Sequence, residues 1–292
     1  MNEEAKFNHS FVLYLEQGVK TYLLKIQQTI SGLNKEESVL FIESIIKWTM
    51  KRYNEEAVIC ALSLSPPVIN GKGEDDYEKW HWIFGKIYMM NNDLQLLVGK
   101  HGNFLKVINK EEILKNWEKV KTDISTLYVT DDVVDFIKNA DDEFNRHFDH
   151  LYLSDVFVHW LFNDIYRSYT QKDKIVTSKL MGKHFGYITL NVDQRKWLEY
   201  VDEEKKEARI AFDTLLKTDH TDVAGINNFL ALEAPDSKEH DLDYEFSCEG
   251  FYQMDISKKP SVKNAEMIIS GKMGDFYART DHYTLIKIEK DE

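Results

Sequence analysis

The sequence predicts a mixed α+β fold, in which antiparallel β-hairpins and a β-meander at both ends pack on a helical middle section. Apolar and polar residues alternate near both ends of the chain, as is typical of strands with one buried face. Over residues 109–169, apolar residues instead recur at intervals of three and four, which is typical of helices. The 292 residues are 43% hydrophobic and 30% charged, so the chain can bury a core of ordinary globular composition.

The first elements are predicted to be a hairpin and a helix. Residues 7–15 and 22–26 alternate around the turn signal Gln17-Gly18 and predict the hairpin. A helix is predicted over residues 34–53, because a capping box precedes apolar residues at helical spacing.

Strands and a helix are predicted to follow. Residues 57–64 alternate as a strand, and the aromatic segment 80–88 begins with the same alternation. A second hairpin is expected over residues 94–108. Asn109 then begins a capping box, which predicts a helix over residues 109–124.

The middle of the chain is predicted to be helical, with one helix over residues 131–151 and another over 156–169. The second is apolar on nearly all sides, so we expect it to be the least exposed element. The polar residues 170–174 mark a candidate boundary between an N-terminal region, residues 1–170, and a C-terminal region, residues 175–292. The alternative of one continuous domain remains open.

The last part is predicted to be one long helix and an antiparallel meander. The helix is expected over residues 194–216, after a strand at 187–192, with the charged run 203–207 on its solvated face. The short strands of the meander are predicted at residues 229–232, 244–248, 250–256, 265–271 and 283–288.

The charge of the chain restricts its partners. A formal net charge of -13 repels nucleic acid and anionic membrane surfaces, whereas a basic protein partner is compatible with it. No apolar stretch is long enough for a membrane helix. Residues 1–6 contain no secretory signal, so we expect a cytoplasmic protein if the chain is complete. If a leader has been removed, a periplasmic protein or a surface lipoprotein is expected instead.

Three side chains in the middle section are candidate metal ligands. On a continuous helix, Glu143, His147 and His150 would lie on one side, as in a zinc or iron site. The spacing differs from the HExxH motif of metalloproteases. The same side chains suit the boundary between a buried and a solvated helix face, so this alternative stays open.

Two other groups are candidate interaction residues. Trp80 and Trp82 share one face of the expected strand, where they suit either a binding surface or core packing. Asp241, Asp243 and Glu245 would form an acidic face on the strand that begins there, and the calcium-binding alternative lacks the glycine that an EF-hand loop needs. Cys60 and Cys248 lack zinc or redox spacing and are expected to be buried apolar residues.

No sequence motif identifies a catalytic centre, a phosphate-binding loop or a cofactor, so no cofactor is predicted. We therefore favour a non-catalytic protein-interaction role, as an immunity-like inhibitor, an adaptor or a dedicated chaperone with an acidic surface. The alternative is a carrier of an apolar ligand in a half-barrel-like C-terminal sheet. Its cavity would be lined by Phe251, Met254, Met267 and Ile269. A metal-dependent hydrolase is the third hypothesis.

Overall fold

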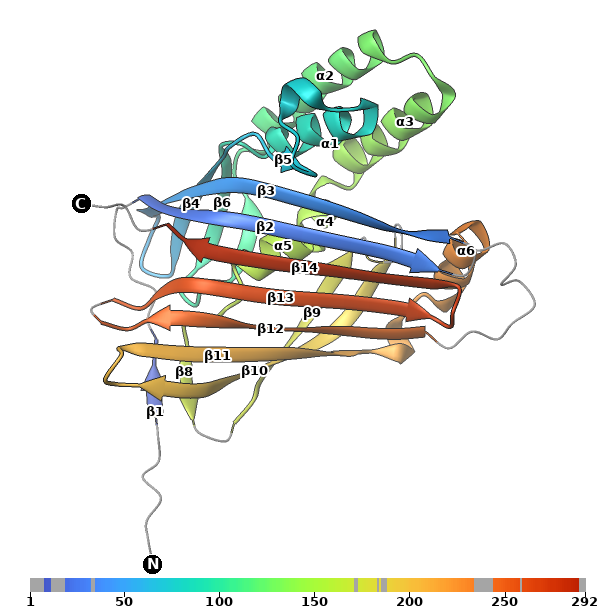
Figure 1. The fold of residues 1–292 in the computed structure, drawn as a ribbon. Coiled ribbons are helices and arrows are strands. Elements are labelled where there is room, and N and C mark those ends of the chain that lie inside the picture. Colours follow the sequence, from blue (N-terminus) through green and yellow to red (C-terminus); the bar gives the residue numbers. More distant parts are fainter. Residues whose placement is uncertain are drawn as a thin grey trace, which may run out of the picture.

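A computed structural model describes residues 8–11, 19–32, 35–170, 173–182, 184, 188–233, 244–257 and 259–288. Their main feature is a 12-stranded antiparallel sheet, which is packed against helices (Figure 1). The strand order is β7-β6-β4-β3-β2-β14-β13-β12-β11-β10-β9, with β5 beside β3. The fold is therefore mixed α+β, as predicted, although most of the chain outside the middle section is strand.

The strands of this sheet come from both ends of the chain. From the N-terminal part come β2 (Val19–Gly32), β3 (Lys35–Arg52), β4 (Ala57–Leu64), β5 (Val68–Ile69), β6 (Leu94–Gly99) and β7 (Phe104–Val107). From the C-terminal part come β9 (Ile175–Gly182), β10 (Thr189–Asp202), β11 (Glu207–Leu216), β12 (Tyr244–Asp255), β13 (Ser261–Met273) and β14 (Tyr277–Lys287). Pairing of β14 with β2 joins the two sets, so hydrogen bonds cross the predicted boundary at residues 170–174.

Most helices of the described chain come from its middle section. The helices are α1 (Lys79–Met90), α2 (Lys110–Leu127), α3 (Asp131–Arg146), α4 (Phe148–Leu153), α5 (Val156–Leu161) and α6 (Val223–Glu233), with single turns at Glu74–Asp76 and Thr218–His220. Figure 1 shows α4 and α5 behind the sheet and α1, α2 and α3 above it. None of the helices that the structure describes is both long and apolar enough to cross a membrane.

The sheet curves around α5 and the segment that follows it. The Phe104 amide in β7 donates to the Phe162 carbonyl (3.3 Å), and the Lys196 ammonium in β10 donates to the Asn163 carbonyl (2.8 Å). Strands near opposite ends of the sheet therefore contact neighbouring residues of one segment. The concave face holds the core, because alternate residues of each strand point inward; in β13 these include Ala265, Met267 and Ile269.

The predicted N-terminal hairpin is wrong in its pairing. β1 (Asn8–Ser10) pairs with β8 (Ser168–Thr170) in a separate two-stranded sheet, and β2 pairs with β3 and β14. The expected turn at Gln17-Gly18 lies outside the described residues. Alternation identifies a strand but does not identify its partner, which here is distant in sequence.

Two predicted helices are strands. Residues 35–52 form β3, in which Ser44, Ile46 and Trp48 point into the core. Residues 194–216 belong to the hairpin of β10 and β11, and the charged run expected on a helix face forms its turn. The Asp202 carboxylate accepts hydrogen bonds from the amides of Glu204 (3.1 Å) and Lys205 (2.9 Å), as in an Asx turn.

Three further predictions are wrong, in each case because apolar content did not distinguish helix from strand. The segment 80–88 lies in α1, and residues 229–232 lie in α6. The apolar segment 156–169 is helical only in α5, after which it becomes irregular and enters β8. The predictions of a strand at 57–64, a hairpin over 94–108 and a helix from 109 are confirmed. Residues 244–288 are mostly strand, as predicted, but the two strands expected at 244–248 and 250–256 form one, β12.

Candidate functional site

Two adjoining cavities lie among the helices, and one of them reaches the concave face of the sheet. The inner cavity has a volume of about 190 Å³ and lies among β2, β4, β6, β14, α1 and α5. The outer cavity, of about 360 Å³, lies among α1, α3 and α4. Asn91, Tyr152 and Asp155 line both of them and so form a shared wall. A small-molecule site of ordinary size has about 300–1,000 Å³, so the two cavities together fall in that range.

The cavities are mostly apolar. Aliphatic strand residues surround the inner cavity, namely Leu24, Ile26, Leu62, Leu64 and Leu94, and Phe157 and Val158 of α5 close it. Phe84, Ile87, Phe136, Ala140, Phe144 and Leu151 line the outer cavity. Their arrangement follows from the inward alternation of the strands and from the apolar faces of α1 and α3.

The shared wall is polar and is built from helix ends. Asn91 is the C-cap of α1, and its side-chain oxygen accepts a hydrogen bond from the Tyr152 hydroxyl (2.7 Å). Asp155 is the N-cap of α5 and accepts a hydrogen bond from the Val158 amide (2.8 Å). Polar groups are therefore held in place by the ends of three helices, α1, α4 and α5.

Tyrosine hydroxyls add hydrogen-bonding groups to the inner cavity. The Tyr88 hydroxyl is buried and has no hydrogen bond of normal geometry within the described chain. Burial raises the pKa of Tyr88 to about 12, and a weaker contact with Ser44 opposes the increase. Burial also raises the pKa of Tyr152 and of Tyr283. At neutral pH these three phenols are therefore protonated. The Tyr152 proton is donated to Asn91, whereas the Tyr88 hydroxyl is able to donate to a ligand.

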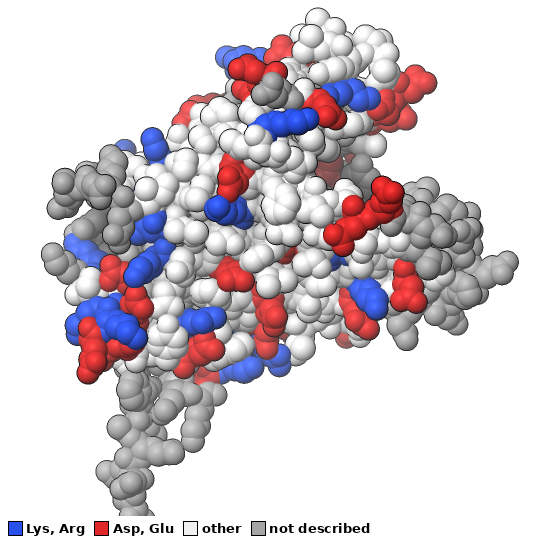
Figure 2. All heavy atoms as spheres, viewed as in Figure 1, with Lys and Arg blue, Asp and Glu red and all other residues white. Residues whose placement is uncertain are grey.

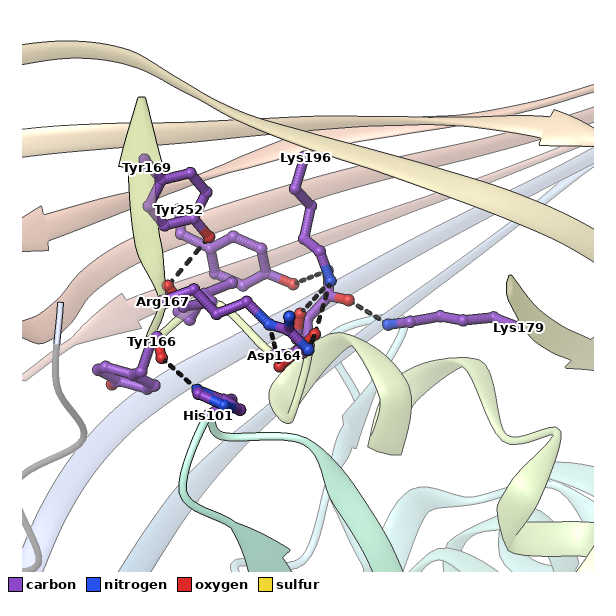
Figure 3. A network of polar contacts seen from close by, with 10 residues as sticks. His101, Asp164, Tyr166, Arg167, Tyr169, Lys179, Lys196 and Tyr252 are labelled. Carbon is purple, nitrogen blue, oxygen red and sulfur yellow. Dashed lines mark hydrogen bonds and ion pairs between the residues drawn. The ribbon is translucent and has the colours of Figure 1, made fainter. Parts of the chain in front are cut away.

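A network of buried charges fixes the segment that follows α5 (Figure 3). The Asp164 carboxylate binds the Arg167 guanidinium (2.6 Å) and lies 3.7 Å from the Lys196 ammonium. Asn163 accepts a hydrogen bond from Lys179 and donates one to the Tyr252 hydroxyl (2.9 Å). The network thus joins this segment to β9, β10 and β12.

The environment of these charges supports a structural role. Lys196 has a side-chain exposure of 0%, and burial lowers its pKa to about 8, although Asp164 acts in the opposite direction. Burial and the neighbouring Lys196 also lower the pKa of Lys179 well below its usual value. Because each group is satisfied by another part of the chain, we interpret the network as an anchor for the segment that closes the core.

A second buried network lies on β14 and β2. The Asp281 carboxylate binds the Arg279 guanidinium (2.8 Å), accepts a hydrogen bond from Gln28 (3.0 Å) and lies 3.5 Å from the His184 ring. Burial opposes ionisation of Asp281, but hydrogen bonds from His184 and Arg279 outweigh it and lower its pKa. The charged groups of this second network therefore also have partners within the network.

The candidate metal ligands do not share one continuous helix. α3 ends at Arg146 and α4 begins at Phe148, so His147 lies at the break. His147 is 3.6 Å from Asp142, and the His150 ring lies 3.1 Å from the Thr189 hydroxyl. Glu143 lines the outer cavity. In the part of the chain that the structure describes, no three His, Cys, Asp or Glu side chains are grouped as metal ligands.

The candidate interaction residues also have separate positions. Trp80 stacks on Phe84 (5.8 Å between ring centroids), and Trp82 packs edge-on against Tyr128 (5.7 Å). Both tryptophans are half-buried on α1, in a small cluster between α1, α2 and α3. Glu245 is exposed on β12 opposite Lys272. Asp241 and Asp243 lie outside the described residues.

Cys60 and Cys248 are both buried and free, in agreement with their interpretation as apolar residues. Met254, Met267 and Ile269, which we expected to line a carrier cavity, are packed into the core. Phe251 points to the opposite face, where the Arg209 guanidinium lies 3.8 Å from its ring centroid. The observed cavities are lined instead by helices and by the strands β2, β4, β6 and β14.

Comparisons with known proteins identify no family. No protein-family model matches the chain, and no curated protein matches it significantly. A solved structure of lipovitellin, which concerns lipid-protein interactions in that protein, superposes with a TM-score of 0.47 and 9% sequence identity. The superposition covers 94% of this chain and 26% of the lipovitellin chain, so this chain spans about a quarter of that protein.

Proposed function

We propose that the protein binds an elongated, largely apolar small molecule in the two adjoining cavities and acts as its carrier. The observation that supports this most directly is the contiguity of the cavities, which share Asn91, Tyr152 and Asp155. Apolar surface around a few fixed polar groups is the usual composition of a ligand site, because the apolar walls give affinity and the polar groups fix orientation.

The buried hydroxyl of Tyr88 supports the same proposal. A buried polar group without a partner costs about 1–3 kcal/mol, and a ligand that accepts its hydrogen bond removes this cost. Tyr88 belongs to α1 and reaches the inner cavity, whereas the outer cavity lies along the same helix at Phe84 and Ile87. A ligand that runs along α1 would therefore contact both cavities.

The proposal is tested with a neutral apolar fluorophore, N-phenyl-1-naphthylamine, whose emission increases in an apolar site. Ala140 on α3 lines the outer cavity, and Ala140→Trp places a large side chain in it. We expect this variant to bind the fluorophore about 10-fold more weakly, since one to two kcal/mol of apolar contact is lost. Val134→Trp, at a 55%-exposed position of the same helix, is the matched control.

Equal binding by the wild type and Ala140→Trp, with both folded by circular dichroism, would contradict the proposal. Native mass spectrometry of protein purified from its own host gives an independent readout. A stoichiometric small-molecule mass that is lost in Ala140→Trp and retained in Val134→Trp is the expected result.

A second candidate function, binding of another protein, is favoured by a groove on the convex face of the sheet. The groove has a volume of about 690 Å³ and lies along β2, β3 and β5. It contains Phe41, which is 48% exposed, and Val68, which is 39% exposed. Exposed aromatic side chains commonly contribute much of the energy of a protein interface.

The charges of this face favour a partner surface that is mainly uncharged. Lys25 binds Glu43 (2.7 Å) within the groove, and Arg195 binds Asp213 (2.6 Å) further along the sheet. Figure 2 shows basic and acidic side chains next to each other on this face.

A photoreactive amino acid at Phe41 is expected to crosslink one defined polypeptide in the host. The same amino acid at the 50%-exposed Leu215 should not, and identical crosslinks at both positions would contradict this candidate.

A further inference from the structure

The described lining of the two cavities contains acidic side chains and no basic one. Asp155 is part of the shared wall, and Glu143 lines the outer cavity. Among the residues that the structure describes, no lysine, arginine or histidine lines either cavity. A ligand carboxylate in this site would therefore meet like charge without a neighbouring cation to balance it.

The charge of Asp155 is not balanced by an ion pair within the described chain. Its carboxylate accepts the capping hydrogen bond from the Val158 amide, which carries no net charge. His159 is close enough to sense this carboxylate, but burial lowers its pKa, so its ring is neutral at neutral pH. The ring nitrogen of His159 lies 2.6 Å from the Leu153 carbonyl and is therefore engaged elsewhere.

Aromatic residues line the inner cavity together with Asp155. Tyr152 shares the wall with Asp155, and Tyr88, Phe157 and Tyr283 line the inner cavity beside it. The faces of aromatic rings attract organic cations, and a carboxylate adds a charge-assisted hydrogen bond to an ammonium group. Carboxylate and rings together therefore favour a positively charged headgroup over a negative one.

We propose that the ligand is a cationic amphiphile, an alkylamine in its chemical class, whose ammonium group binds at Asp155 while its apolar chain extends along the cavities. This inference rests on the proposed carrier function and specifies its substrate class. The net charge of -13 also attracts such a ligand and repels fatty-acid anions at long range.

The test compares three probes with the same chain: dodecylamine, dodecanol and dodecanoate, each at a concentration at which it is monomeric. Displacement of N-phenyl-1-naphthylamine from the wild-type protein by each probe is measured in competition. We expect dodecylamine to bind about 10-fold more tightly than dodecanol, because a hydrogen bond between two charged groups is stronger than one that a neutral hydroxyl makes. Dodecanoate is expected to bind most weakly.

Asp155→Asn isolates the charge, because asparagine caps a helix as well as aspartate does. This variant is expected to lose the preference for dodecylamine and to keep its affinity for dodecanol within about 2-fold. Glu143→Gln is the matched control at the outer cavity, and it should retain most of the preference.

The outcomes separate the inference from the carrier function. Binding of dodecanol and dodecanoate as tightly as dodecylamine would overturn the inference and leave the carrier function supported. An unchanged preference in Asp155→Asn would also overturn the inference. Displacement of the fluorophore by none of the three probes would overturn the carrier function, and the inference with it.

Discussion

Asp164 has a left-handed backbone conformation, with φ of 57°, immediately after the buried Asn163. A residue other than glycine in this conformation carries strain of about 1–3 kcal/mol, and asparagine and aspartate adopt it most readily. Its position between Arg167 and Lys196 explains why an aspartate is suited to this turn. The backbone conformation and the charge of one residue therefore serve the same anchor.

Asp164→Asn should be strongly destabilising, although asparagine fits the backbone. The substitution leaves Lys196 buried without a negative partner, which typically costs about 3–5 kcal/mol. Urea unfolding measures the change, and Asp164→Asn with Lys196→Met should be more stable than Asp164→Asn alone. Asp213→Asn, which breaks the partly exposed pair with Arg195, should cost no more than about 1 kcal/mol. Similar losses in both single variants would contradict the anchor role.

Lys196 should also make stability depend on alkaline pH. Its pKa is about 8 in the folded chain and 10.5 for an ordinary lysine, so the unfolded chain binds more protons between these values. The titration of Lys196 therefore increases the free energy of unfolding as the pH rises from 8 toward 10.5. This increase is lost as the pH falls to 8. The expected increase in the free energy of unfolding is about 1.5 kcal/mol between pH 8 and about pH 9.5.

Urea unfolding of wild type and Lys196→Met at both pH values measures this contribution. The wild type should gain stability relative to Lys196→Met as the pH rises. The difference between the two proteins is used because buried tyrosines such as Tyr166, whose pKa burial raises, oppose stability at higher pH in both. A difference that does not change with pH would show that Lys196 titrates normally.

At the scale of elements, β3 shows why periodicity predicted helices where strands occur. Both faces of β3 carry large apolar residues: Ile46 and Trp48 point into the core, and Phe41 is exposed beside the convex groove. With apolar residues on both faces, the alternation is masked and helical spacing is satisfied by chance. The pairing of β3 with β2 and β4 then decides the conformation, because each strand completes the hydrogen bonds of the others.

The candidate site was predictable only where one residue carries a local signal. Ser154 and Asp155 have the character of a helix cap, and Asp155 does cap α5. Glu143 was singled out as a metal ligand and lies instead on the outer cavity. Tyr88 and Asn91 carry no such signal, because α1 contacts α4 and α5 only through tertiary packing, which spacing along the chain does not encode.

Gly250 tests the close packing of β12 against its neighbours. A Cβ atom at this position would lie 2.1 Å from the Glu266 carbonyl oxygen and 2.7 Å from the Phe212 ring. Gly250→Ala should therefore lower the free energy of unfolding by about 1–3 kcal/mol, as overpacking does in other cores. Ser247→Ala, at an exposed position on the convex face of β12, should change it by less than about 0.5 kcal/mol. Equal effects of the two substitutions would show that β11 and β13 move apart without cost.

At the scale of the whole molecule, one sheet joins the two ends of the chain. β2 and β14 pair along Tyr22–Ser31 in the middle of the strand order, with β3 and β13 on their outer sides. The anchor around Asp164 connects the segment after α5 to strands of the C-terminal part. The carrier cavity depends on the same arrangement, because its inner half is lined by β2, β4, β6 and β14.

This arrangement predicts that residues 175–292 do not fold alone. Without β2, the paired edge of β14 would be open, and Lys196 would lose its contacts with Asn163 and Asp164. The isolated fragment should give a poorly dispersed amide spectrum, and tryptophan fluorescence and circular dichroism of the whole chain should follow one urea transition. The control is the same fragment mixed with residues 1–174 as a separate polypeptide, because these residues supply the missing strands. A well-dispersed spectrum from 175–292 alone would mean that the pairing of β14 with β2 joins two independent units.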